Sequence, residues 1–177
     1  MQVKELSISG VFLITPEVFY DERGSFFESF NHANFEKAVN RKVAFFQDNH
    51  SISKKGVIRG LHFQLKHQQG KLIRVVKGKI FDVAIDIRKD SPTYGCWLGE
   101  IISAKNKKQL WIPEGFAHGF QVLSSSAELV YKTTDYYFAQ FERTILWNDK
   151  DLNILWPIKT QPILSNKDQS GVNFCEI

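Results

Sequence analysis

Residues 79–87 read KIFDVAIDI, and this stretch decides the fold class. Phe81, Val83, Ile85 and Ile87 alternate with Asp82, Ala84 and Asp86. Side chains of a β-strand point alternately to its two faces, so this order predicts a strand with one wholly apolar face.

Similar short runs surround this stretch on both sides. Gly, Pro and Ser separate them, as in Gly78, Ser91-Pro92, Pro113 and Ser124–Ser126, and these residue types favour turns. The runs are KLIRVV (71–76), WLGEII (97–102), KQLWI (108–112), GFQVL (119–123) and AELVYKTT (127–134). Many short strands at even spacing predict an all-β sandwich or barrel, with jelly rolls among the options.

Helical periodicity is weak by comparison. The best helix candidate is 31–39, where Phe35 and Val39 are four residues apart and Asn31 can cap the first turn. Residues 159–177 are expected to be irregular and to wrap over the surface.

Length and composition favour one soluble domain over residues 1–177. Of the 177 residues 43% are apolar, and phenylalanine alone occurs 15 times. The net charge of +4 suits an anionic ligand but is too small and too scattered for nucleic acid. We find no membrane span and no signal peptide, and we interpret Cys96 and Cys175 as free thiols, so we expect a cytoplasmic protein.

The segment GVIRGLHFQ (56–64) places an arginine and a histidine in an otherwise apolar strand. Alternation assigns Leu61 and Phe63 to a packed layer and leaves His62 and Gln64 to line a polar interior. Arg59 falls on the wrong face, unless Gly60 marks a bulge or Arg59 lies at the mouth of the strand. Taken alone, His62 also fits a hydrogen-bonded core histidine.

A second histidine lies in IPEGFAHGF (112–120). The spacing Pro-x-Gly-x-x-His resembles the second metal motif of the cupin family, whose metal-binding members add a His-x-His pair and a glutamate from an earlier strand. Here His62 is followed by Phe63 and Gln64, so the second histidine of that pair is missing. Two histidines alone make a poor transition-metal site. We therefore predict a cupin-like jelly-roll barrel with a few short helices and with no metal in its pocket.

A pocket that holds histidine, lysine and tyrosine favours proton transfer. Lys71 opens a strand after the loop HQQG, and Tyr131 is in phase with Leu129 and Thr133. The plain alternatives are a solvated strand end for Lys71 and a wall residue with a bonded hydroxyl for Tyr131.

Longer motifs cover nearly the whole chain. They are DERGSFFES (21–29), FQDNHSIS (46–53), GVIRGLHFQ (56–64), QGKLIRVVKGKIFDVAIDIRKDSPTYG (69–95), NKKQLWIPEGFAHGF (106–120), LVYKTTDYY (129–137), LWNDKDLNILWP (146–157) and LSNKD (164–168). With them the chain resembles the dTDP-4-dehydrorhamnose 3,5-epimerase family of nucleotide-sugar metabolism. The resemblance implies a cupin jelly roll, a homodimer and a dTDP-sugar substrate, with no cofactor.

The resemblance also implies roles for individual residues. His62 matches the general base, with Asp168 as its dyad partner, Tyr131 matches the general acid, and Lys71 matches the group that steadies the enolate. Arg23 and Arg59 match contacts to the diphosphate. The remaining matches to substrate-binding positions are Glu28, Gln47, Asp48, Asn49, His118, Glu142 and Lys167.

The implied reaction is cofactor-independent epimerisation of dTDP-4-keto-6-deoxy-D-glucose at carbons 3 and 5, which gives dTDP-4-keto-L-rhamnose for dTDP-rhamnose biosynthesis. The ketone at carbon 4 acidifies the hydrogens on both neighbours, and histidine, with a free pKa of about 6.5, suits the base. Three alternatives stay open: a related 3- or 5-epimerase or ketoisomerase, a metal-dependent cupin enzyme, and a sugar-nucleotide binding module without catalysis.

Overall fold

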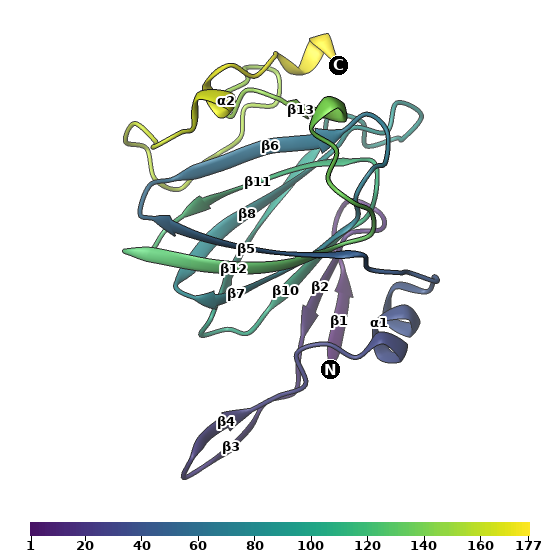
Figure 1. The fold of residues 1–177 in the computed structure, drawn as a ribbon, viewed down its shortest axis with the longest axis vertical. Coiled ribbons are helices and arrows are strands. Elements are labelled where there is room, and N and C mark those ends of the chain that lie inside the picture. Colours follow the sequence, from purple (N-terminus) through teal and green to yellow (C-terminus); the bar gives the residue numbers. More distant parts are fainter.

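The protein is built from two antiparallel β-sheets that face each other, as the computed structural model of residues 1–177 shows (Figure 1). The six-stranded sheet has the order β1 (Gln2–Glu5), β2 (Phe12–Thr15), β10 (Gln109–Ile112), β7 (Lys71–Lys77), β12 (Ser126–Thr133) and β5 (Gln47–Lys54). The five-stranded sheet has the order β13 (Glu142–Thr144), β6 (Ile58–Gln64), β11 (Phe116–Val122), β8 (Lys79–Asp86) and β9 (Trp97–Ser103). The prediction of an all-β, cupin-like jelly roll is confirmed.

The helical segments are few and short, as expected. Helix α1 (His32–Val39) begins at Asn31, whose side chain accepts a hydrogen bond from the backbone N–H of Asn34, and it buries Phe35 and Val39. These are the cap and the apolar pair that the sequence predicted. Helix α2 (Asn166–Gln169) and two 3₁₀ turns, Ala139–Phe141 and Phe174–Glu176, complete the set.

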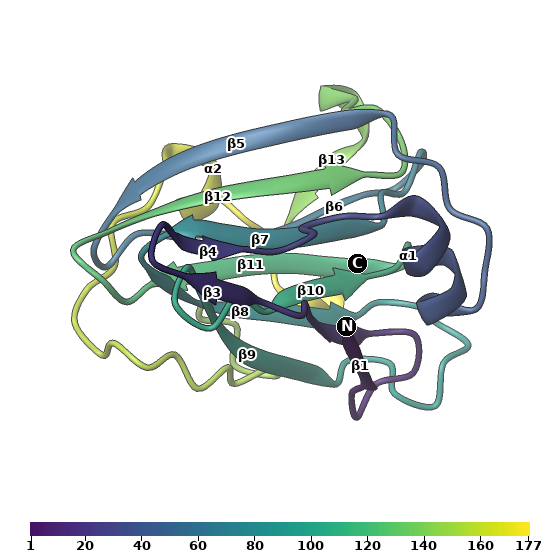
Figure 2. The same cartoon turned by 90° about the horizontal axis from the view of Figure 1, so that it is seen from below.

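Strands β3 (Phe19–Asp21) and β4 (Gly24–Phe26) form a separate hairpin. Figure 1 shows it projecting away from both sheets. Seen from below, β5 and β9 lie at opposite edges of the molecule (Figure 2). No helix of this structure is long and apolar enough to cross a membrane.

Strand β8 explains why both faces of the five-stranded sheet are buried. Ile80 and Ala84 point into the main core between the sheets, together with apolar residues of β7, β11 and β12. Val83 and Ile85 point the other way, into a second core that the C-terminal segment covers with side chains such as Trp156. The alternation in KIFDVAIDI is therefore confirmed.

A third apolar cluster holds α1 against the outer face of the six-stranded sheet. Phe35 packs edge-on against Trp111 of β10, with ring centroids 5.1 Å apart. Leu72 of β7 belongs to the same cluster, so β7 is also covered on both sides.

Strand β6 contains the irregularity that brings two polar side chains to the same face. His118 of β11 lies opposite His62, and Phe120 lies opposite Arg59, so β6 has one residue more than β11 between the two pairs. This is a β-bulge, and it turns Arg59 back to the inner face. Of the two explanations open for Arg59, the structure shows the bulge.

Glycine is required at the bulge. Gly60 has φ = 126°, and a Cβ atom there would lie 2.5 Å from Cα of Gly119. Only glycine combines this backbone conformation with so close an approach of two strands.

Candidate active site

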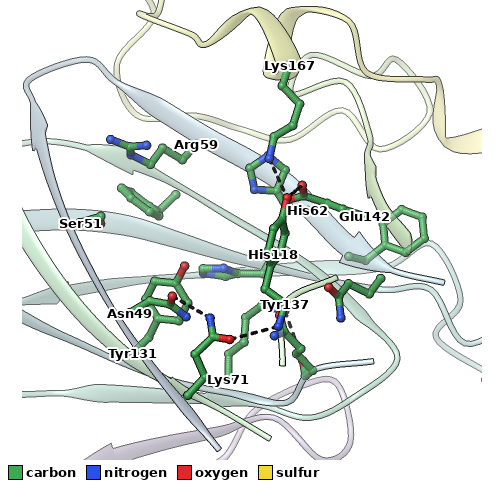
Figure 3. A pocket seen from close by; sticks show the side chains of 15 residues that line it. Asn49, Ser51, Arg59, His62, Lys71, His118, Tyr131, Tyr137, Glu142 and Lys167 are labelled. Carbon is green, nitrogen blue, oxygen red and sulfur yellow. Dashed lines mark hydrogen bonds and ion pairs between the residues drawn. The ribbon is translucent and has the colours of Figure 1, made fainter. Parts of the chain in front are cut away.

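A cavity of about 310 Å³ opens between the sheets, and most of its lining residues are polar (Figure 3). A volume of this order suits a small-molecule ligand. The lining residues are Gln47, Asn49, Ser51, Arg59, His62, Phe63, Gln64, Gln69, Lys71, His118, Phe120, Tyr131, Tyr137, Glu142 and Lys167. Most of the site residues predicted from the sequence therefore share one cavity.

His62 forms a dyad with Asp168 across 106 residues of sequence. Its Nε2 lies 2.6 Å from Oδ1 of Asp168. The other carboxylate oxygen accepts a hydrogen bond from the Ser165 hydroxyl at 2.7 Å, and Ser165 also caps α2. Short loops and a four-residue helix thus fix a nearly buried carboxylate beside a strand histidine.

The charge of Asp168 determines which nitrogen of His62 can act as a base. Burial alone would raise the pKa of Asp168, but the hydrogen bonds from His62 and Ser165 outweigh burial and lower it. An ionised carboxylate accepts the Nε2 proton of His62, and Nδ1 is then free to accept another proton.

Tyr131 enters the cavity from the opposite sheet. It belongs to β12 of the six-stranded sheet, whereas His62 belongs to β6 of the five-stranded sheet. Burial raises the pKa of Tyr131, and the negative charge of Glu142 adds to this effect, while Arg59 opposes it. The phenol therefore keeps its proton at neutral pH and can donate it.

Lys71 is a buried cation in the same cavity. Only 8% of its surface is exposed, and Nζ donates to the carbonyl oxygen of Gln69 at 3.2 Å. Burial lowers the pKa of Lys71 to about 8, although the negative charges of Glu114 and Glu142 partly offset this. The ammonium form thus prevails at pH 7, where it can stabilise negative charge on a ligand.

Glu142 joins two other lining residues into a rim. It accepts hydrogen bonds from Nζ of Lys167 at 2.8 Å and from the hydroxyl of Tyr137 at 2.7 Å. Burial would raise the pKa of Glu142, but these two hydrogen bonds lower it. The hydrogen bond between Tyr137 and Glu142 raises the pKa of Tyr137.

Only two of the three substrate-binding residues predicted on β5 line the cavity. Gln47 and Asn49 line it, and Nε2 of Gln47 donates to Oδ1 of Asn49 at 2.9 Å. Asp48 lies between them on the other face, where it pairs with Lys132 at 3.0 Å. Alternation along the strand therefore places Asp48 outside the cavity of its own chain.

Arg23 and Glu28 also lie outside this cavity. Arg23 belongs to the projecting hairpin, where its side chain is 90% exposed and pairs with Asp21. Glu28 accepts hydrogen bonds from Asn31 and Asn34 at the start of α1. Within one chain, neither residue lines the site.

The sequence interpretation missed several lining residues. Ser51 shares the inner face of β5 with Gln47 and Asn49, so alternation could have identified it. Gln69 and Tyr137 lie outside regular strands, where no periodicity indicates the direction of a side chain.

Metal ligation was one of the open alternatives. No group of three or more His, Cys, Asp or Glu side chains in this structure is arranged to hold a metal ion. Nε2 of His118 instead lies 2.8 Å from Oδ1 of Asp82.

Comparison with known proteins places this geometry in a family. The profile of dTDP-4-dehydrorhamnose 3,5-epimerase matches residues 5–176. The dTDP-4-dehydrorhamnose 3,5-epimerase of Shigella flexneri is 59% identical over 99% of this chain and 97% of that protein. The enzyme of the same name from Pseudomonas aeruginosa is 53% identical over 99% and 97% of the respective chains.

Solved structures agree. The dTDP-6-deoxy-D-glucose-3,5-epimerase of Legionella pneumophila, in complex with dTDP-4-keto-L-rhamnose, superposes with a TM-score of 0.95. It is 47% identical, over 97% of this chain and 92% of that one. The protein therefore belongs to the dTDP-4-dehydrorhamnose 3,5-epimerase family.

Proposed function

We propose that this protein epimerises dTDP-4-keto-6-deoxy-D-glucose at carbons 3 and 5 and so produces dTDP-4-keto-L-rhamnose for dTDP-rhamnose biosynthesis. One observation supports this above all: His62, with Asp168 behind it, and a protonated Tyr131 enter one cavity from opposite sheets. Epimerisation removes a proton from one face of a carbon and delivers another to the opposite face.

Each step then uses a group already in place. Nδ1 of His62 takes the proton from the carbon beside the ketone, and Asp168 stabilises the imidazolium that forms. Lys71 stabilises the enolate oxygen, and Tyr131 donates a proton from the other side. Acid or base assistance of this kind contributes about a hundred- to ten-thousand-fold, and no cofactor takes part in these steps.

Binding of the nucleotide part holds the ring still during both transfers. Arg59 is the diphosphate ligand in this proposal. Its Nε donates to the hydroxyl of Ser53 at 3.0 Å, which fixes the guanidinium at the cavity. Gln47, Asn49, His118, Glu142 and Lys167 supply further polar contacts from the wall.

Proton exchange with solvent tests the proposal directly. The enzyme is incubated with the keto sugar in heavy water, and NMR follows each ring position. We expect deuterium at carbons 3 and 5 and none with His62→Ala. Uptake at one carbon alone would indicate a 3- or 5-epimerase, and normal uptake with His62→Ala would refute the base assignment. Loss of activity after chelation, with recovery on metal addition, would instead favour the metal-dependent cupin.

The position of Arg23 and Glu28 supports a homodimer. The hairpin that carries Arg23 also exposes 57% of Phe19 and 74% of both Tyr20 and Phe26. Apolar groups exposed to this extent favour contact with another chain. We infer that a second copy receives the hairpin and that Arg23 and Glu28 complete the site of that copy.

Subunit mixing tests this arrangement. Arg23→Ala and His62→Ala should each abolish most activity as pure dimers. After both variants are unfolded and refolded together, mixed dimers contain one site without either change, and activity should return to about a quarter of wild type by random pairing. No recovery, or a monomer by light scattering, would refute the shared site.

A reducing compartment fits the cysteines. Cys96 and Cys175 are both exposed, and they form no disulfide. Disulfides are rare in the cytosol, so these free thiols support a cytoplasmic location.

A further inference from the structure

Asp82 is a buried carboxylate that the steps above leave unused. It points inward from β8 and has no exposed surface. Its Oδ1 lies 2.8 Å from Nε2 of His118, and its Oδ2 has no hydrogen-bond partner in the protein. A carboxylate this deeply buried is costly unless every lone pair is satisfied.

Asp86, on the same face of the same strand, shows what a purely structural carboxylate looks like here. It accepts hydrogen bonds from the guanidinium of Arg88 and from the hydroxyls of Ser91 and Thr93. These contacts lie at the end of β8, away from the cavity lining. Asp86 therefore ties a turn to the sheet, whereas Asp82 has a single partner, and that partner lines the cavity.

The pair of Asp82 and His118 repeats the arrangement of Asp168 and His62. In both pairs, a carboxylate outside the cavity lining contacts Nε2 of a histidine that lines it. The two histidines are direct neighbours across β6 and β11. The cavity thus contains two imidazoles, each with a carboxylate behind it.

The Asp82 contact determines what His118 can offer a ligand. An ionised Asp82 accepts the proton on Nε2, so Nδ1 is the only polar side-chain atom of His118 without a protein partner. Nδ1 is therefore the atom of His118 that can meet a ligand, and an Nδ1–H group there would donate a hydrogen bond to it. The other titratable groups that line the cavity are His62 of β6, Lys71 of β7, Tyr131 of β12, Glu142 of β13, and Arg59, Tyr137 and Lys167.

We propose that Asp82 is a positioning residue that holds His118 with its Nδ1–H toward the cavity, as a second hydrogen-bond donor beside Lys71 for the ligand oxygen that becomes negatively charged. This inference rests on the proposed epimerase function, in which that oxygen is the ketone oxygen of the sugar. Two donors match the charge of an enolate better than one, because each adds stabilisation only as the charge develops.

Asp82→Asn tests the role while nearly preserving shape. The asparagine oxygen can still accept from Nε2, but the charge that favours a proton on Nδ1 is gone. We expect kcat to fall at least ten-fold and KM to change less than three-fold. His118→Ala should lose at least as much, and the double variant should be no slower than His118→Ala alone, because Asp82 acts only through His118.

Nitrogen NMR reports the protonation of each ring nitrogen of His118. This signal would not change if Asp82 had only a structural role. Wild-type enzyme saturated with dTDP-L-rhamnose should show both ring nitrogens of His118 protonated, and Asp82→Asn should show Nδ1 bare. Asp149→Asn removes another buried carboxylate, one that caps the backbone N–H groups of Leu152 and Phe174 outside the cavity. It should lower the melting temperature without this spectral change.

Several results would overturn the inference. They are an unchanged kcat in Asp82→Asn, additive losses in the double variant, or a bare Nδ1 on His118 in the liganded wild type. The last measurement needs no variant to fold. Failure of the proposed function is a separate result, because wild-type enzyme would then take up no deuterium at either carbon whatever the state of His118.

Discussion

Replacing Lys71 with methionine should make the protein more stable and nearly inactive. The pKa of Lys71 falls from an ordinary 10.5 to about 8, chiefly because of burial. At about 1.4 kcal/mol for each pKa unit, holding this ammonium inside the fold costs about 3 kcal/mol at pH 7. Methionine has a similar length and no charge, so Lys71→Met removes this cost.

The stability difference between Lys71→Met and the wild type should depend on pH. Below pH 8, Lys71 is charged in both the folded and the unfolded protein, so Lys71→Met has its full gain in the free energy of unfolding. Between pH 8 and 10.5 the unfolded chain binds a proton that the folded chain does not, so the stability of the wild type rises relative to the variant. The difference should vanish near pH 10.5.

Urea denaturation across this pH range, followed by tryptophan fluorescence, measures the difference. Lys77→Met is the matched control, because Lys77 lies on the same strand with 66% of its side chain exposed, and its effect should stay within about 0.5 kcal/mol. Activity of Lys71→Met should fall by about a hundred- to a thousand-fold, as for loss of one donor to a developing oxyanion. The reasoning is refuted if Lys71→Met gains no stability at pH 7, or if its gain does not change with pH.

Three further changes follow from the same geometry. Tyr131→Phe should retain binding of dTDP-L-rhamnose but slow reprotonation at least a hundred-fold, and weakened binding with intact turnover would contradict the acid role. Glu114→Gln removes a negative charge that raises the pKa of Lys71, so the alkaline limb of the pH–rate profile should move to lower pH, and an unmoved limb would contradict this. Gly60→Ala should destabilise the protein by about 2 kcal/mol or more, because the new Cβ meets the backbone of β11 at 2.5 Å. Gly56→Ala, also at a positive φ but with nothing within 4 Å of the new Cβ, measures the strain of the backbone alone. Equal losses in the two glycine variants, measured by thermal melting, would show that the close approach of the strands is unimportant.

Most of the strands and the main helix could be predicted from the sequence, because hydrophobic periodicity and burial are properties of short segments. KIFDVAIDI shows the two faces of β8, and Asn31 with Phe35 and Val39 marks α1. The order of the strands in each sheet depends on pairings between distant segments, which no local pattern specifies.

The candidate site was predictable to different degrees. His62 and Gln64 follow from alternation, but the direction of Arg59 depends on a bulge that Gly60 permits and no alternation rule requires. Asp168 reaches His62 from behind the cavity wall through a loop and a short helix, so only the family resemblance indicated it. Arg23 and Asp48 matched family positions, yet in a single chain the hairpin and the strand alternation direct both away from the cavity.

The distance along the chain between His62 and Asp168 has a consequence for biosynthesis. During translation every strand of both sheets emerges before the carboxylate, because β13 ends at Thr144. A nascent chain can therefore pair all its strands while His62 still lacks its carboxylate partner. The contact between His62 and Asp168 forms only when the final segment leaves the ribosome and docks, so on the proposed mechanism we expect an interrupted product to be inert toward the keto sugar.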